Sequence, residues 1–324
     1  MQARAGPSCH RRRRNRSMSP SPNRTPPSST CVAICTCDRH AHLHKLLSHM
    51  PHSFEGQQVT IFVADNGNAS AAKTLDPFRD RFDIHYLRVA QSGVSPARNA
   101  VLRAAFDAGY AFVACIDDDE WPTPQWLTSL SAPGLAGQAD IVIGPSKADL
   151  QQNDPSWIID GALLDRYGLL FGTHNILLSA AVMPPSETDW FKDEFAHSGG
   201  GDWEFITRMA KAGARLAYAP DALVHEHVPA RRKTIRYFLS LGVREGTTFV
   251  KAARLQNKGR LRPVLLSLRE MLRKIGFGLY HIALSPTARW HLVRAGMDFS
   301  AAAAILPALL GQSFAFYGRE RTRS

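Results

Sequence analysis

The sequence predicts an α/β fold with a mostly parallel sheet that helices cover on both faces. Short apolar runs alternate with helical segments from residue 31 onward, which is typical of strands that are buried on both faces. Acidic residues and a threonine stand directly after several of these runs, and ligands collect at the carboxyl ends of parallel strands. With 324 residues, of which 44% are apolar, the chain can form one large domain with an appendage.

The predicted elements follow one another from residue 31. CVAIC at residues 31–35 is a continuous apolar run and predicts a buried strand, and residues 43–50 predict the first helix. VTIFVA at residues 59–64 predicts the second strand by the same reasoning. Further apolar runs predict strands at residues 84–89, 111–116, 139–144 and 172–178, and helices are predicted at residues 96–108 and 203–212.

The first 30 residues contain an arginine run at positions 11–14, then Ser-Pro repeats, and no apolar run. We therefore expect residues 1–30 to be a disordered basic tail. No apolar segment follows the arginines, which argues against a secretory signal, and Met18 is an alternative start.

The net charge of +11 is unevenly distributed. Residues 1–30 carry seven arginines and no acid, residues 31–230 carry 14 basic and 24 acidic residues, and residues 231–324 carry 18 basic and four acidic residues. A basic flank can attract nucleic acid or an anionic membrane surface. In the C-terminal part the charge is interleaved with apolar helical periodicity and no nucleic-acid-binding motif is present, so we expect a membrane surface and no nucleic acid.

A catalytic domain is expected at residues 31–250, followed by a helical, membrane-associating region at residues 251–324. Apolar residues recur at helical spacing from Leu261 to Leu279 with arginine and lysine between them, which predicts an amphipathic helix. Two interpretations stay open, packing of this helix on the catalytic domain and contact with a membrane. Residues 299–318 are uncharged but contain serine, proline, glycine and glutamine, which favours a re-entrant or interfacial segment over a membrane span.

The cysteine pattern indicates the compartment. The chain has five cysteines, an odd number, with no CxxC pair and no histidine partner at zinc-finger spacing. Three of the five fall in predicted buried strands, where a free cysteine behaves as a small apolar residue. We therefore expect a reducing cytoplasm.

Four consecutive acids, Asp117 to Glu120, follow the apolar strand predicted at residues 111–116. Carboxylates crowded at the end of a buried strand repel one another, and a bound cation relieves that repulsion. Hard carboxylate oxygens at this density suit Mg²⁺ or Mn²⁺ better than zinc. The alternative is a solvated acidic turn.

Eight short segments occur in a characteristic order. They are TCDR at residues 36–39, VADN at 63–66, GVSPARN at 93–99, IDDD at 116–119, GP at 144–145, GTHN at 172–175, GGGDWE at 199–204 and VHEHVP at 224–229. Together they resemble glycosyltransferase family 2 enzymes of the GT-A fold over about residues 31–250. Within that family the chain is similar to bacterial exopolysaccharide glycosyltransferases of the succinoglycan ExoM type.

The resemblance implies a nucleotide-binding role for four residues. Asp65 matches the carboxylate that accepts a hydrogen bond from the base, and Thr36 matches a residue that lines the same pocket. Asp38 stands where the family often has asparagine and is given a secondary part. Arg98 matches the nucleotide-contacting arginine of the third segment; the alternative is a surface arginine on a helix.

The resemblance also implies the phosphate and metal ligands. Asp119 would bind a divalent ion that bridges the two phosphates, and Asp117 would hold the ribose or a metal-bound water. Asp118, between them, is grouped with the nucleotide-sugar ligands, although it can also point away from the donor. A third metal ligand is expected from the last segment, where His225 is the first candidate and Glu226 and His227 are its rivals.

Asp202 matches the family's general base, which deprotonates the acceptor hydroxyl. Gly201 stands where the family often has glutamate, which leaves the base in place but changes its neighbour. The alternative for Asp202 is an N-cap of the helix predicted at residues 203–212. Glu204 is a second candidate for the base.

The resemblance thus implies an inverting hexosyltransferase that uses a nucleotide-sugar, expected to be a UDP-hexose, and Mg²⁺ or Mn²⁺. The expected acceptor is a saccharide linked to a polyprenyl lipid, in cell-surface or exopolysaccharide biosynthesis, at the inner face of the cell membrane. Two other functions are weighed. A sugar nucleotidyltransferase needs a Gly-rich loop with a basic residue after the first strand, which the segment at residues 36–39 lacks. A non-enzymatic basic adaptor for membrane or nucleic acid would not explain acids at so many strand ends.

Overall fold

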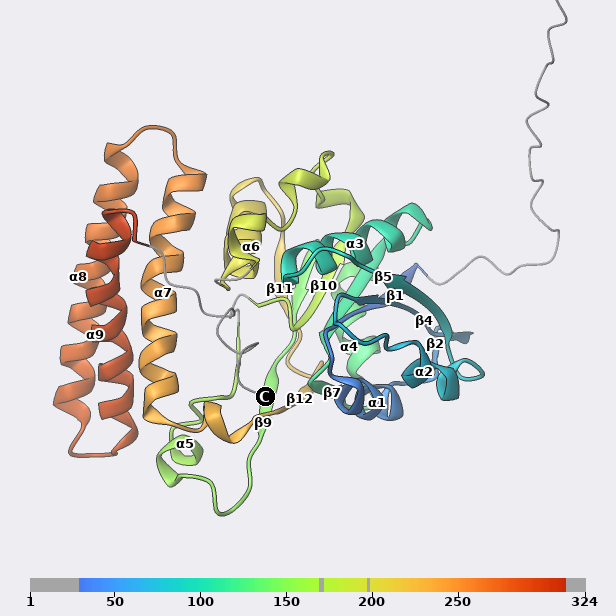
Figure 1. The fold of residues 1–324 in the computed structure, drawn as a ribbon, viewed down its shortest axis with the longest axis horizontal. Coiled ribbons are helices and arrows are strands. Elements are labelled where there is room, and N and C mark those ends of the chain that lie inside the picture. The colour runs from blue at the N-terminus through green and yellow to red at the C-terminus, as the bar shows by residue number, and fades with distance from the viewer. Residues whose placement is uncertain (1–28, 169–171, 197–198, 313–324) are drawn as a thin grey trace, which may run out of the picture.

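The computed structural model describes residues 29–168, 172–196 and 199–312. Its centre is a seven-stranded sheet in the order β11-β8-β10-β6-β1-β4-β5 (Figure 1). Most neighbouring strands are parallel, while β10 runs antiparallel to both β6 and β8. The strands are β1 (Thr30–Thr36), β4 (Thr60–Asp65), β5 (Asp83–Arg88), β6 (Phe112–Asp117), β8 (Ile141–Ile143), β10 (Asn175–Ser179) and β11 (Leu216–Tyr218).

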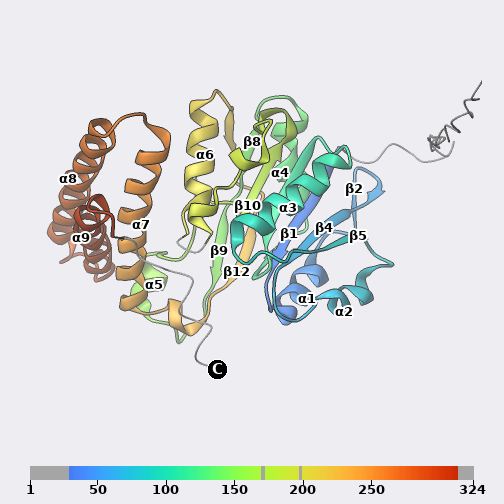
Figure 2. The same ribbon diagram turned by 45° about the horizontal axis from the view of Figure 1, so that its top comes forward.

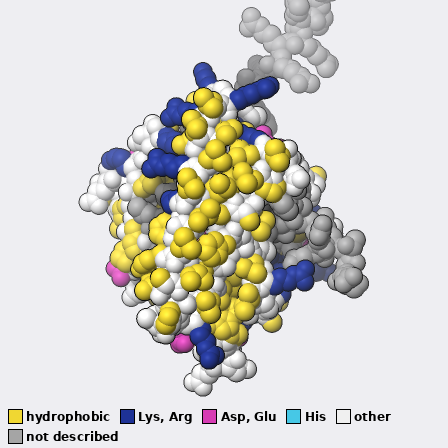
Figure 3. Space-filling view, turned by 90° about the vertical axis from the view of Figure 1, so that its left-hand side faces the viewer, with side chains coloured by type: hydrophobic (Ala, Val, Ile, Leu, Met, Phe, Trp, Pro, Cys, Tyr) yellow, Lys and Arg dark blue, Asp and Glu magenta, His cyan; other side chains and the backbone are white. Residues whose placement is uncertain are grey.

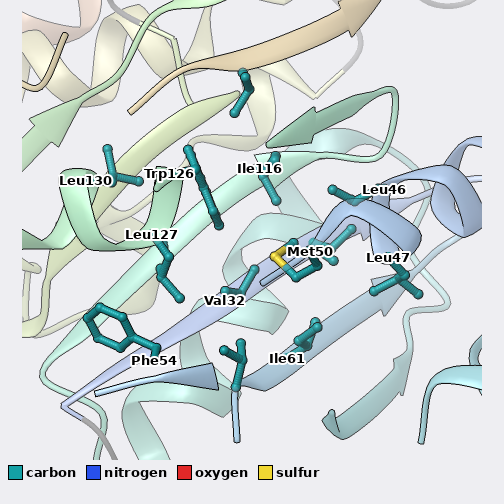
Figure 4. Packing of buried hydrophobic residues seen from close by; sticks show 14 of the residues in the cluster. Val32, Leu46, Leu47, Met50, Phe54, Ile61, Ile116, Trp126, Leu127 and Leu130 are labelled. Carbon is teal, nitrogen blue, oxygen red and sulfur yellow. The ribbon is translucent and has the colours of Figure 1, made fainter. Parts of the chain in front are cut away.

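Helices cover both faces of this sheet (Figure 2). On one face lie α1 (His40–His49), α2 (Ala72–Leu75) and α4 (Trp126–Leu135), which share an apolar core with alternate residues of β1 such as Val32 and Ile34 (Figure 4). On the other face, α3 (Val94–Asp107) and α6 (Gly201–Lys211) pack over Cys31 and Ala33. The two cores follow from side chains that alternate across a strand. The sequence prediction of an α/β fold with a mostly parallel sheet is confirmed.

A second, three-stranded sheet in the order β7-β12-β9 stands beside the carboxyl end of β6. It consists of β7 (Glu120–Pro122), β9 (Ser146–Asp149) and β12 (Val224–His227). Because β7 begins at Glu120, the last acid of the run, this sheet fixes the backbone on which that run ends. The smaller elements are the hairpin β2 (Ser53–Phe54) and β3 (Gln57–Gln58), helix α5 (Ser156–Asp160), and 3-10 helices η1 (Asp76–Phe78), η2 (Ala180–Val182), η3 (Glu187–Asp189), η4 (Asp193–Phe195) and η5 (Ala230–Arg232).

Three long helices end the described chain: α7 (Ile235–Gln256), α8 (Leu261–Leu284) and α9 (Trp290–Leu309). They form a bundle at one side of the molecule, with α9 packed against both α7 and α8 (Figure 1). The close approach of α7 to α9 requires small residues, because a methyl group at Gly242 or Gly246 would collide with backbone carbonyls of α9. Helix α7 crosses the boundary expected between residues 250 and 251.

Two expectations fall wholly or partly outside the described residues. The basic tail predicted at residues 1–30 is described only for its last two residues, and the segment predicted at 299–318 is described as far as residue 312, with α9 ending at Leu309. Four of the five cysteines are described, and all four are free thiols: Cys31, Cys35, Cys37 and Cys115.

Candidate active site

The strand ends that the sequence singled out lie side by side in the sheet. In the register of β1 and β4, Thr36 pairs with Asp65, and in the register of β1 and β6, Cys35 pairs with Asp117. The parallel order of these three strands therefore brings residues from three separate segments to one edge of the sheet. Such an edge is where ligands bind in open α/β sheets.

The middle acid of the run points into the protein. Asp118 is 4% exposed, accepts a hydrogen bond from Thr36 Oγ1 at 2.8 Å and forms an ion pair with Arg39 at 2.9 Å. Burial raises the pKa of the Asp118 carboxyl to about 6, although Arg39 acts in the opposite direction. Asp118 therefore holds Thr36 and Arg39 in place. This orientation agrees with the alternative that Asp118 points away from the donor.

Asp119 lies beside two arginines. Its carboxylate is 3.0 Å from Arg39 Nη1 and 3.9 Å from Arg232 Nη2, and its side chain is 12% exposed. The backbone carbonyl of Asp119 accepts a hydrogen bond from His227 N at 2.8 Å, which ties the end of the acidic run to the end of β12. Asp119 thus stands at the junction of both sheets.

A cavity of about 330 Å³ opens at this junction. Asp119, His42 and His227 border it, and the two imidazole rings lie with their centroids 4.8 Å apart at an angle of 38°. Its other lining residues are rich in cationic side chains and are Asp38, Arg39, His40, Ala41, Pro229, Arg231 and Arg232. The cavity combines two carboxylates, Asp38 and Asp119, with three arginines, which suits a divalent ion and phosphate groups.

Buried carboxylates hold the arginines of this junction. Glu226 is 4% exposed and pairs with Arg166 at 3.1 Å and with Arg232 at 2.8 Å. Glu120 lies opposite Glu226 in the register of β7 and β12 and accepts a hydrogen bond from Ser146 Oγ at 3.1 Å. Burial, more than any neighbouring charge, raises the pKa of both carboxyls. The sequence analysis did not identify Arg166. Its role depends on its pairing with the buried Glu226, which the sequence does not show.

Asp65 and Asp38 both bind the chain that follows β4. Asp65 is fully buried, and its oxygens accept hydrogen bonds from Gly67 N at 2.9 Å, Ala71 N at 2.8 Å and the Tyr86 hydroxyl at 2.6 Å. Asp38, in the left-handed region with φ 56°, accepts hydrogen bonds from the backbone of residues 68 and 69 at 2.7 and 2.9 Å. Both acids therefore shape the loop at one side of the site.

A second group of charges joins the sheet edge to α6. Arg98 Nη2 is 3.4 Å from Asp117 Oδ1, and the arginine side chain is 13% exposed, which contradicts the alternative of a surface helix arginine. Burial lowers the pKa of Arg98, but Asp117 and Asp202 outweigh burial and raise it. Burial raises the pKa of Asp117, with smaller contributions from Asp119 and Asp202, and Arg98 opposes them. Asp117 thus pairs with the buried Arg98 guanidinium, and the charge of Asp202 also acts on it.

Asp202 is in the first turn of α6, with its Oδ2 accepting a hydrogen bond from Thr173 N at 3.4 Å. The N-cap of this helix is Gly200, with a left-handed φ of 85°, so the N-cap alternative for Asp202 is wrong. Helix α6 begins two residues earlier than the predicted helix, because the glycine supplies the turn. Glu204 is 1% exposed and pairs with Arg208 at 2.8 Å, so we do not carry it further as a base.

His225, Glu226 and His227, the three candidates for the third metal ligand, lie on β12, where successive side chains point to opposite faces. Glu226 points inward, and His225 and His227 lie on the opposite face of β12. His225 stacks on Trp121 with ring centroids 5.8 Å apart and does not line the cavity, whereas His227 does. Of the two histidines, His227 is the one placed beside Asp119.

No group of three or more His, Cys, Asp or Glu within the described ranges is arranged as a metal site. Mg²⁺ is usually bound through one or two protein carboxylates together with substrate phosphates. Asp119 and Asp38 are the carboxylates that border the cavity, and Asp38 is engaged with the backbone of residues 68 and 69. Imidazoles of His40, His42 and His227 also border it. The donor set therefore fits an ion that a diphosphate completes.

An α/β fold with acids and cations gathered at the carboxyl edge of a parallel sheet has the arrangement at which such folds bind ligands. Residues 31–181 match the family model for Glycosyl transferase family 2. The succinoglycan biosynthesis protein ExoM of Rhizobium meliloti (strain 1021) is 32% identical over 209 residues, covering 60% of this chain and 65% of that protein. Residues 31–181 are therefore similar to a glycosyltransferase family 2 domain, and the fold is GT-A.

One further curated protein is similar in sequence, and one solved structure is similar in fold. The pre-mycofactocin glycosyltransferase of Mycobacterium tuberculosis (strain ATCC 25618 / H37Rv) is 26% identical over 247 residues, covering 69% of this chain and 49% of that protein. The chain thus spans less than two thirds of the length of both curated relatives. The mannosyltransferase PcManGT from Pyrobaculum calidifontis, solved with GDP-Man and Mn²⁺, has a TM-score of 0.52 and 16% identity, covering 86% of this chain and 87% of that one.

Proposed function

We propose that the chain is an inverting glycosyltransferase that moves a hexose from a UDP-sugar to a saccharide acceptor. The observation that carries the proposal is the cationic cavity at Asp119, two residues along the chain from Asp117, which pairs with Arg98. The charge of Asp202, in the first turn of α6, also acts on Arg98. The first group suits a nucleoside diphosphate, and the second supplies a carboxylate for proton transfer. Family membership supports the same reaction class.

In the donor half, Arg39 and Arg232 would stabilise the negative charge that develops on the departing diphosphate. Both guanidiniums are held by buried carboxylates, Asp118 and Glu226, so they are oriented before the donor binds. A bound Mg²⁺ or Mn²⁺ would supply further Lewis-acid neutralisation at the phosphates. Asp119 would hold that ion, with His227 in place of the expected His225.

In the acceptor half, Asp202 would accept the proton of the acceptor hydroxyl. The acceptor oxygen forms a bond to the anomeric carbon while the bond from that carbon to the phosphate oxygen breaks. Attack from the side opposite the leaving group inverts the anomeric configuration. Thr173 Oγ1 and His174 Nε2 are buried atoms without a hydrogen-bond partner within the described part of the chain, and we infer that they bond hexose hydroxyls.

We further propose a lipid-linked saccharide as the acceptor, in exopolysaccharide or cell-surface synthesis. The name of the relative from Rhizobium supports this choice, and so does the basic C-terminal region. The enzyme would then work in the cytoplasm, peripherally attached to the inner face of the membrane through residues 251–324.

Calorimetric titration with UDP, with and without Mn²⁺, tests the donor half. We expect binding that requires Mn²⁺ and is lost in Asp119→Ala, whereas Asp107→Ala, an exposed acid at the end of α3, should bind as the unchanged protein does. Retained binding in Asp119→Ala would refute the assigned metal ligand. Absence of binding with UDP, GDP and dTDP alike would refute the transferase proposal and favour a non-enzymatic adaptor.

A further inference from the structure

Helix α8 turns its apolar residues toward solvent. Leu261 is 71% exposed, Leu272 66% and Leu279 59%, whereas an amphipathic helix on a soluble protein turns its apolar stripe toward the core. These residues share one face through helical spacing. Its other exposed large apolar side chains are Val264, Leu265, Phe277, Tyr280 and Ile282.

The inner face of α8 includes two polar residues, Ser267 and Lys274. Ser267 is fully buried there, and the Lys274 side chain is only 11% exposed. Lys274 pairs with Glu245 of α7 at 2.7 Å and with Asp298 of α9 at 3.1 Å. Rotating the apolar face inward would bring Lys274 away from both carboxylates, so these ion pairs hold the helix with its apolar face outward.

Basic residues border the apolar face. Arg262 and Arg269 are exposed on α8, and Arg273 is half exposed, while the one acid of this helix, Glu270, pairs with Arg273. Figure 3 shows this side of the molecule as a broad band of apolar side chains with lysine and arginine near its ends. An apolar face with a basic border matches the chemistry of an anionic lipid surface.

The neighbouring helix α9 has a different role. Among the described residues it is the one helix that is long and apolar enough to cross a membrane by length and composition. It packs against both α7 and α8, and the glycines of α7 lie on its backbone. The face that is left for a partner therefore belongs mainly to α8.

We propose that α8 lies in the plane of an anionic bilayer, with its leucines in the acyl boundary and its arginines at the lipid phosphates. A second copy of the chain is a weaker occupant, because residues 231–324 carry 18 basic and four acidic residues and two such faces would repel each other. This inference deepens the membrane partner of the proposed function and names the helix that makes the contact.

Vesicle flotation of the purified full chain tests it, with vesicles of phosphatidylcholine alone and of phosphatidylcholine with phosphatidylglycerol. Replacing Leu265, Leu272 and Leu279 together with serine should weaken binding to the anionic vesicles by about a hundredfold or more. Replacing Arg262, Arg269 and Arg273 with glutamine should weaken it by about fivefold for each arginine, and only on anionic vesicles. The control is Leu135→Ser, an equally apolar residue that is 39% exposed on the catalytic domain.

Circular dichroism and UDP titration of each variant show whether the fold and the donor site are intact. Unchanged vesicle binding by the triple serine variant would overturn the proposal. A chain that ignores vesicles but dimerises through this face in analytical ultracentrifugation would overturn it in favour of self-association. Vesicle binding without UDP binding would leave this inference standing and refute the proposed function alone.

Discussion

Replacing Asp65 with asparagine separates two roles that the family resemblance and the geometry assign to the same carboxylate. The resemblance makes Asp65 a ligand of the base, whereas the structure surrounds both of its oxygens with protein donors. Arg88 Nη1 lies 2.9 Å from Oδ2, in addition to the two backbone N–H groups and the Tyr86 hydroxyl. We expect Asp65→Asn to act first on stability.

The size of the effect follows from these contacts. Asparagine keeps one acceptor oxygen. Its amide NH₂ group replaces the other oxygen and faces N–H and O–H donors that bond that oxygen in the unchanged protein. A hydrogen bond to a charged group is worth about 1.5–3 kcal/mol, and removing one partner of a buried ion pair costs about 3–5 kcal/mol. Arg88 is 43% exposed and can return to water, so we expect a loss of about 3–4 kcal/mol. Tyr86→Phe, which removes one of the bonds, should cost about 1.5–3 kcal/mol.

Urea unfolding followed by circular dichroism measures these changes, and UDP calorimetry on the folded variants measures the donor site. Ser70→Ala is the matched control, because Ser70 bonds the same Tyr86 hydroxyl at 2.9 Å but does not touch Asp65. Burial raises the pKa of Asp65, but Tyr86, the two N–H groups and Arg88 together hold it below its ordinary value. Its stabilisation is therefore present at neutral pH and is lost as the pH falls through the folded pKa, so variant and parent should converge in acid. An Asp65→Asn protein that unfolds like its parent and yet fails to bind UDP would refute this reasoning.

Three further predictions concern the base, the bundle and its acid stability. Asp202→Asn should lower kcat by about 10²–10⁴-fold with unchanged UDP affinity, and an unchanged kcat would remove Asp202 as the base. Gly246→Ala should destabilise the bundle by about 1–3 kcal/mol, because the added methyl group would collide with the Ala301 carbonyl. Gly276→Ala has open space around it and should be neutral or stabilising. Equal melting temperatures of the two variants would contradict this packing. Burial lowers the pKa of His281, as do His291 and Arg294, while Asp298 acts in the opposite direction. The stabilisation from His281 is therefore fully present above about pH 6.5 and is lost as the pH falls below that value. His281→Asn should make the melting temperature depend less on pH below about 6.5.

The sequence determined the edge of the sheet at which the site lies, because strand ends can be read from apolar runs. It also indicated that Asp117, Asp119 and Asp202 belong together, through the family resemblance. The direction in which each side chain points could not be predicted from the sequence. The three consecutive aspartates are equivalent as a sequence, and only the positions of Thr36 and Arg39 turn Asp118 inward.

The choice between His225 and His227 shows the same limit. Both point to one face of β12, so periodicity cannot separate them. Their neighbours do, since Trp121 of β7 covers His225 and the turn that carries Asp119 reaches His227. A site whose ligands come from segments a hundred residues apart is decided by such neighbours.

The orientation of helix α8 also depends on its neighbours in the structure. Its periodicity predicts an amphipathic helix equally well whether the apolar face is buried or exposed, and the sequence left both interpretations open. The side that is buried is decided by Lys274, whose partners Glu245 and Asp298 lie on two other helices. A lysine that is paired with two carboxylates inside the bundle leaves the leucines on the outside, where water is a poor solvent for them and the boundary of a lipid bilayer is a good one.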